Sequence, residues 1–82
     1  MEQIARTSMQ IGAALRRRRR SAGLSQDALA AKTKLRQATL SALEKGVADN
    51  RLQTLIQVMA ALGLEMVIRE RTMAADNIED VF

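Results

Sequence analysis

The sequence contains no cysteine and no histidine. Disulfide bonds, zinc fingers, thiol nucleophiles and imidazole acid–base catalysis are therefore excluded. The chain also offers no nucleophile–base pair and no glycine loop that would cradle a phosphate. We expect a protein that is not an enzyme, with no catalytic residue, no metal site, no cofactor and no small-molecule ligand.

Aromatic residues are almost missing: one Phe stands without any Tyr or Trp, although 48% of the residues are hydrophobic. Ala, Leu, Ile, Val and Met supply that fraction, which suits thin, closely packed helices. The scarcity of rings on which bases would stack argues against an RNA-binding protein.

Long apolar runs are missing too. No stretch approaches the roughly 20 apolar residues that span a bilayer, and residues 1–8 have no secretory pattern. We expect no membrane partner and a cytoplasmic location.

Charge is unevenly distributed along the chain, whose net charge is +4. All thirteen Lys and Arg residues lie at or before Arg71, whereas Asp76, Glu79 and Asp80 follow it. A basic body attracts polyanions, and an acidic tail stays solvated or binds a basic partner. Because 82 residues lie near the lower limit for a self-sufficient core, a partner subunit is also expected.

The spacing of apolar residues predicts a first helix over residues 9–22, with Ser8 as its N-cap and Gly23 as its stop. Ser25 then has the place of an N-cap before a short second helix over residues 26–32. Both helices begin after a small hydroxyl side chain, which can accept a hydrogen bond from a free backbone N–H of the first turn.

Residues 33–35 form a tight connection to a third helix, which ends at Gly46. Two short helices joined by three residues are typical of a helix-turn-helix motif. After a polar loop, a fourth helix should be capped by Asp49 or Asn50 and stopped by Gly63.

Residues 64–70 roughly alternate apolar and charged side chains, which predicts a single β-strand. The chain offers no second strand, so this strand should pair with its own copy, antiparallel across a two-fold axis. Core packing is expected for Met59 and Met66. The residues that would form the dimer strand are Leu64, Met66, Val67 and Ile68.

Three parts of the chain are thus expected: a helix-turn-helix domain at residues 1–63, a dimerisation strand at 64–71 and a flexible acidic tail at 72–82. The tail lacks periodicity, yet three apolar residues stand among its acids. These residues either dock into a partner or belong to a frayed terminus. They are Ile78, Val81 and Phe82.

A family signature runs through residues 9–63. It consists of Ile11-Gly12, Leu15-Arg16, Arg19, Gly23-Leu24-Ser25-Gln26, Leu29-Ala30, Thr39-Leu40-Ser41, Leu43-Glu44-Lys45-Gly46, Leu52, Leu55 and Ala61-Leu62-Gly63. This pattern resembles the phage repressor and Cro-type helix-turn-helix family. The resemblance implies a mainly α, lambda-repressor-like domain of four to five helices, to which the C-terminal strand is added.

With its added strand and short tail, the chain is similar to the HipB-type antitoxins, and residues 35–41 are similar to their recognition helix. The resemblance implies a sequence-specific repressor of double-stranded DNA that autoregulates its operon and binds a HipA-type kinase toxin. Three positions depart from the family pattern. Lys34 replaces a common turn Gly, Arg36 replaces a common N-cap Ser or Thr, and Arg18 replaces a frequent apolar residue.

The N-terminal end of a recognition helix faces the base edges, so Arg36, Gln37 and Ala38 are candidate base readers. Arg can fork onto guanine, Gln can fork onto adenine, and the Ala methyl can pack on a thymine methyl. Gln26 at the start of the second helix could contact a phosphate or a base and brace the first reader. For the three candidate readers the alternative is a polar turn that only faces solvent, and for Gln26 it is an ordinary surface glutamine.

Candidate phosphate contacts are Ser25, Thr39, Ser41 and Lys45. For Ser25 a plain capping role is the alternative. Residues 16–20 are five consecutive arginines, which point around the whole helix and cannot all touch DNA. We expect a mostly solvated face, with some attraction to phosphates.

Arg19 is the exception within the arginine run. In the resembling family this position pairs with the Glu that stands here as Glu44. The resemblance therefore implies a structural ion pair that pins the first helix to the third.

The leading hypothesis is an autoregulating antitoxin, a homodimer that binds a palindromic operator in the major groove and has a HipA-type kinase toxin as a possible partner. The alternative is a free-standing phage-type repressor without a toxin partner. A pure interaction module is a further alternative, and it would show no salt-dependent DNA binding.

Overall fold

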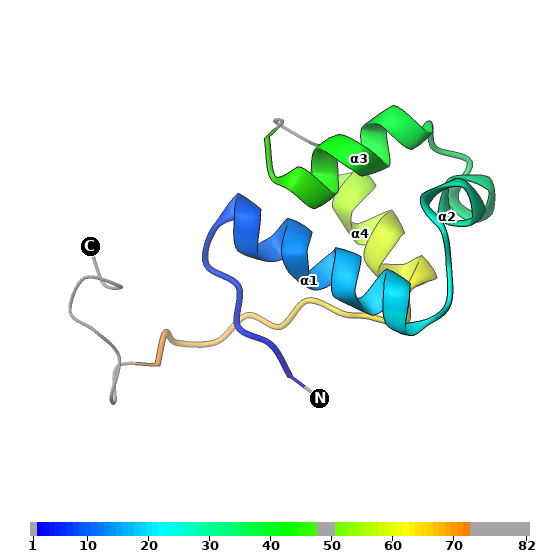
Figure 1. Ribbon diagram of the computed structural model, residues 1–82. Helices are drawn as coiled ribbons and strands as arrows, with labels where there is room; N and C mark the ends of the chain where they lie inside the picture. The colour runs from blue at the N-terminus through cyan, green and yellow to red at the C-terminus, as the bar shows by residue number, and fades with distance from the viewer. Residues whose placement is uncertain (1, 48–50, 73–82) are drawn as a thin grey trace.

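The computed structural model describes residues 2–47 and 51–72 of the chain. These residues form four helices, α1 (Ser8–Ser21), α2 (Gln26–Thr33), α3 (Gln37–Lys45) and α4 (Leu52–Ala61). In Figure 1 a short connection joins α2 to α3 at one end of the molecule, while α1 crosses in front of α4. The expected mainly helical fold is confirmed, and the first two helices lie within one residue of their predicted bounds.

Hydroxyl side chains cap the first two helices. Thr7 is extended at φ −135° and ψ 161°, and its Oγ1 accepts a hydrogen bond from the N–H of Gln10 at 3.1 Å. The prediction of Ser8 as the cap is wrong by one residue, because Ser8 is already the first residue of the helix. At α2 the prediction is confirmed: the Oγ of Ser25 accepts from the N–H of Ala28 at 3.0 Å.

The fourth helix starts without a side-chain cap. Arg51 occupies the N-cap position and makes no capping hydrogen bond. The predicted caps, Asp49 and Asn50, lie outside the described residues. At the other end Gly63 adopts a φ of +72°, which agrees with its predicted role as the stop.

The turn between α2 and α3 has the left-handed backbone that usually requires glycine. Lys34 ends α2 at φ 61° and ψ 27°, and its N–H donates to the carbonyl of Ala30. Within the described residues it is the one non-glycine residue with a positive φ. A side chain at such a position costs about 1–2 kcal/mol. Lys34, which replaces the turn glycine common in the family, therefore leaves the turn intact but strains its backbone.

All four helices contribute to one small core, in which α1 packs on α3, and α2 packs on both α3 and α4. Met59 packs partly buried against this core as expected. Met66 is 49% exposed, so its expected core position is wrong, because the chain leaves the helical body after α4. The buried apolar residues are Leu15, Leu29, Leu40, Leu43, Val58 and Leu62.

Residues 64–72 form no regular secondary structure, and no strand occurs in the part of the chain that the structure describes. In Figure 1 this segment runs past the N-terminal segment, and Nη1 of Arg69 lies 3.7 Å from Oε1 of Glu2. The predicted strand is therefore not formed by one chain alone. Among the described helices, none is long and apolar enough to cross a membrane.

Candidate nucleic-acid interface

The first turn of α3 is exposed, while the apolar residues of the same helix point into the core. Leu40 and Leu43 are buried in the core, whereas Arg36, Gln37 and Ala38 are exposed. Arg36 is the N-cap residue, and its side chain makes no capping hydrogen bond. The three candidate base readers therefore stand together at the free end of α3.

Gln26 lies next to these readers and is held from two sides. Its Nε2 donates to Oε1 of Glu44 at 3.2 Å, and its Oε1 accepts a longer contact from Nε2 of Gln37 at 3.4 Å. The structure thus brings Gln26 and Gln37 together across the helix-turn-helix, as the predicted bracing role requires.

A buried ion pair lies beneath Gln26 and joins α1 to α3. Nε of Arg19 donates to Oε2 of Glu44 at 2.6 Å, and Nη2 donates to Oε1 at 3.0 Å. Nη1 of Arg19 donates to the carbonyl of Leu24 at 2.8 Å. The two side chains are 8% and 4% exposed, and no buried side-chain polar atom of the described residues lacks a partner. Such a fork-to-fork pair fixes the angle between the two helices.

Two opposing effects act on the Glu44 carboxylate. Burial raises its pKa, but hydrogen bonds from Arg19 and Gln26 and the nearby charge of Arg16 lower it, so that the net pKa lies below the ordinary value. The hydrogen bond to Glu44 raises the pKa of Arg19 despite its burial. The pair is therefore charged at neutral pH, and Gln26 hydrogen-bonds to a carboxylate.

The candidate phosphate contacts occupy different places. Ser25 is exposed but uses its Oγ as the cap of α2. Thr39 is half-buried beside the base-reading turn. Ser41 and Lys45 follow Gln37 by one and two helical turns, so they continue the same face of α3.

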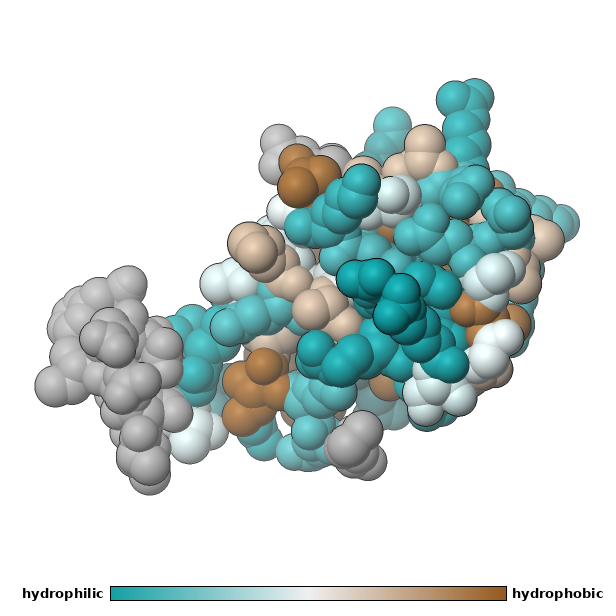
Figure 2. Space-filling view, viewed as in Figure 1, coloured by the Kyte–Doolittle hydropathy of each residue, from teal (hydrophilic) through white to brown (hydrophobic). Residues whose placement is uncertain are grey.

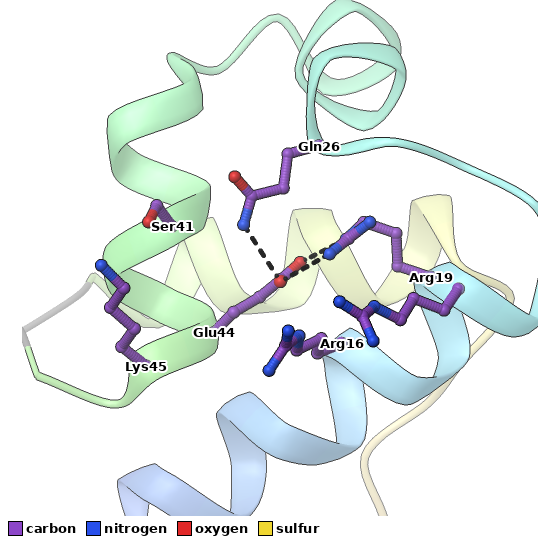
Figure 3. Close-up of a pocket in the computed structure, with 7 residues that line it drawn as sticks. Arg16, Arg19, Gln26, Ser41, Glu44 and Lys45 are labelled. Carbon is purple, nitrogen blue, oxygen red and sulfur yellow. Dashed lines mark hydrogen bonds and ion pairs between the residues drawn. The ribbon is translucent and has the colours of Figure 1, made fainter.

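A hollow of about 310 Å³ lies between α1, α3 and the start of α2. Figure 3 shows its side chains converging from these three elements. Two of them, Arg16 and Arg20, were not singled out from the sequence, although their spacing of four residues places them on one face of α1. The lining residues are Arg16, Arg19, Arg20, Gln26, Ser41, Glu44 and Lys45.

The side chains of the arginine run, residues 16–20, have different partners. Nε of Arg18 donates to the carbonyl of Leu62 at 2.9 Å, at the C-terminal end of α4, which gives this departure from the family pattern a structural role. Nη2 of Arg17 donates to Oε1 of Gln3 at 2.8 Å. In Figure 2 strongly hydrophilic side chains gather over α1 on the face shown.

The candidate dimer strand exposes its apolar residues in a single chain. Leu64 is half-buried against the core, whereas Val67 and Ile68 are 63% and 93% exposed. The tail residues proposed for docking, Ile78, Val81 and Phe82, lie outside the described residues. In residues 2–47 and 51–72 there is no group of three or more potential metal ligands.

Known proteins share this architecture. The helix-turn-helix family profile matches residues 15–68. A HipB variant in an O2 20mer complex is 26% identical, with a TM-score of 0.80, over 88% of this chain and 100% of its own. A HipB–O4 20mer complex has 27% identity and a TM-score of 0.79, over 87% of this chain and 100% of its own.

A HipA–HipB–O2–O3 complex also contains a similar chain, with 27% identity and a TM-score of 0.78. The match covers 87% of the present chain and 100% of that one. Comparison with curated protein sequences gives no significant match.

Proposed function

Because the chain belongs to the helix-turn-helix family, we propose that it is a sequence-specific repressor that reads the major groove of double-stranded DNA through α3. The observation that carries the proposal is the exposed turn of Arg36, Gln37 and Ala38, in which Gln26 braces Gln37. An Arg fork suits guanine, a Gln amide suits adenine, and the Ala methyl suits thymine. A preset Gln37 loses less rotamer freedom on binding than a free one.

The repressor is proposed to act as a homodimer. Residues 64–70 of two copies would pair antiparallel, which would satisfy the free backbone groups of an otherwise unpaired segment. The same pairing would cover Val67 and Ile68, which are exposed in one chain. The two recognition helices would then lie about 34 Å apart, in successive major grooves of a palindromic site.

The experiment that tests this function is a mobility shift on the DNA upstream of the gene, together with sedimentation of the free protein. We expect a dimer at micromolar concentration and a salt-dependent complex that unrelated DNA of equal length does not compete away. Equal affinity for both DNAs would refute sequence-specific repression. A monomer at micromolar concentration would refute the strand pairing.

Alanine substitutions at Arg36 and Gln37 test the base-reading turn. Each should cost about 1–3 kcal/mol of operator affinity, because one bidentate base contact is lost. Binding to unrelated DNA should change much less. Gln3→Ala is the matched control, since Gln3 is an exposed glutamine on the N-terminal segment, remote in sequence from the turn. Unchanged operator affinity in Gln37→Ala would place the recognition surface elsewhere.

We further propose that the protein is an antitoxin that autoregulates its operon and binds a HipA-type kinase toxin. Support comes from the similar chain in a complex that contains both HipA and HipB. The proposed docking segment is the acidic tail of residues 72–82, with Ile78, Val81 and Phe82 as apolar anchors. A free-standing repressor is the second candidate, since a tail that only frays needs no partner.

Truncation of residues 72–82 separates these candidates. It should leave operator binding within a few-fold and weaken binding of the co-encoded kinase substantially, while Phe82→Ala alone should cost about 1–3 kcal/mol of kinase affinity. The measurement is a titration of each dimer with the purified kinase. Equal kinase affinities would remove the tail from the interface, and no binding by the full chain would favour a free-standing repressor.

A further inference from the structure

We propose that Arg16 and Arg20 of α1, together with Lys45 of α3, clamp one DNA backbone phosphate in the hollow beside Gln26. The DNA-contacting surface would then extend from the recognition helix onto α1. This inference rests on the proposed DNA-binding function and adds to it a phosphate site on the arginine run.

The hollow holds more positive charge than its own residues neutralise. Four cationic side chains and one carboxylate line it, which leaves a surplus of three positive charges. Arg19 is committed to Glu44 and to the carbonyl of Leu24. Arg16, Arg20 and Lys45 are exposed, and in the described part of the chain none of their side chains has a hydrogen bond or an ion pair, although the charge of Arg16 acts on Glu44 from a distance. Their donors are therefore available to an external anion.

The placement of these cations suits a phosphate group. Arg16 and Arg20 lie one helical turn apart on α1, and Lys45 of α3 lines the same hollow. Figure 3 shows Arg16 and Lys45 on opposite sides of Glu44, and the long lysine side chain can turn toward an anion bound between them. Phosphate oxygens accept charge-assisted hydrogen bonds from several directions at once, and guanidinium forks match them well. The Ser41 hydroxyl and the Gln26 amide border the same hollow and add neutral donors.

Continuity with the base-reading turn indicates that DNA supplies the phosphate. Lys45 follows Gln37 by eight residues, roughly 12 Å along the helix at 1.5 Å per residue. The major groove is only about 8.5 Å deep. With Gln37 at the base edges, the hollow would lie near the rim of the groove, where the backbone phosphates run. Gln26 connects the two places, because it contacts Gln37 and lines the hollow.

The test compares two double variants of equal net charge. Arg16→Gln with Arg20→Gln removes two charges from the hollow, and Arg17→Gln with Lys32→Gln removes two charges outside it. Both pairs lower the net charge of the chain equally, so long-range attraction changes alike. Affinities for operator and for unrelated DNA are measured between 50 and 200 mM salt, and thermal melting of both variants confirms that they fold.

We expect the hollow variant to lose at least about tenfold in affinity, equally for operator and unrelated DNA, because a phosphate contact carries no sequence information. Its plot of log affinity against log salt should become less steep by about 0.9, the value for one phosphate. The control pair should keep the wild-type slope.

Three outcomes would refute the phosphate clamp but not the proposed DNA-binding function, and a fourth would refute that function. An unchanged slope in the hollow variant, with operator preference intact in the wild type, refutes the clamp alone. A loss confined to the operator makes these arginines base readers instead. Binding of ATP or inorganic phosphate that the hollow variant abolishes, with the DNA slope unchanged, assigns the hollow to a free phosphorylated ligand. Absence of operator preference in the wild type refutes the proposed function itself.

Discussion

Glu44→Ala should lower the free energy of unfolding by about 3–5 kcal/mol, because it leaves a buried guanidinium without its carboxylate. As whole residues Arg19 and Glu44 are only 7% and 8% exposed, so water reaches the pair only from the hollow that it lines and replaces the lost partner poorly. The carbonyl of Leu24 would remain as the only hydrogen-bond acceptor that the structure gives Arg19. Urea denaturation followed by circular dichroism measures the loss. Glu2→Ala, at a carboxylate whose side chain is 81% exposed, should stay within about 0.5 kcal/mol of the wild type.

A double replacement separates the structural role of the pair from its role at the DNA surface. Arg19→Met with Glu44→Leu should recover most of the lost stability, since apolar residues of similar volume often replace a buried ion pair without loss. Operator binding should nevertheless fall, because Gln26 would lose its acceptor on Glu44 and would hold Gln37 less firmly. A cost below about 1 kcal/mol for Glu44→Ala would mean that the pair is solvated.

The same pair predicts how stability depends on pH. Burial raises the pKa of Glu44, but the hydrogen bonds from Arg19 and Gln26 outweigh it and hold the pKa below its ordinary value. A carboxylate with a lowered folded-state pKa stabilises the fold above the unfolded value of about 4.3. That stabilisation is lost as the pH falls through the folded-state pKa. Between these two values the wild type should lose stability more steeply than Glu44→Gln.

The helical framework could be predicted because local chemistry determines it. Ser25 caps α2 through a neighbouring N–H, and Gly63 ends α4 in a left-handed conformation. Both signals act within a few residues of the chain. The cap of α1 was misplaced because Thr7 and Ser8 are adjacent hydroxyl residues, and the sequence alone does not show which one lies outside the helix.

The parts that sequence could not predict depend on contacts between distant segments. Arg18 hydrogen-bonds to the carbonyl of Leu62, 44 residues away, so a polar residue at a frequently apolar position gains a partner that no local pattern reveals. Arg16 and Arg20 share a face of α1, but only the packing of α1 on α3 shows that Lys45 stands opposite them. Met66 was expected in the core because periodicity cannot show where the chain leaves the helical body.

Gly12→Ala should destabilise the protein by about 3 kcal/mol or more, although in most helices this change stabilises by about 1 kcal/mol. Gly12 is buried where α1 crosses α3. A Cβ built on it would lie 2.7 Å from the carbonyl carbon of Glu44, and closer still to the carbonyl oxygens of Leu43 and Glu44. These are backbone atoms, so no side-chain rotation relieves the overlap. Only a movement of α1 away from α3 can accommodate the methyl group.

That movement links the fold to the proposed function, since it would separate Arg19 from Glu44 and open the hollow between the two helices. Gly23→Ala is the matched control: its Cβ would meet no atom within 4 Å, and only its φ of +75° disfavours a side chain. It should cost about 1–2 kcal/mol and leave operator affinity unchanged in the folded fraction. Gly12→Ala should lose both stability and operator affinity at temperatures where it remains folded. Equal or greater stability of Gly12→Ala, measured by urea denaturation, would show that α1 and α3 do not approach this closely in solution, and the bidentate geometry of the ion pair would then need another explanation.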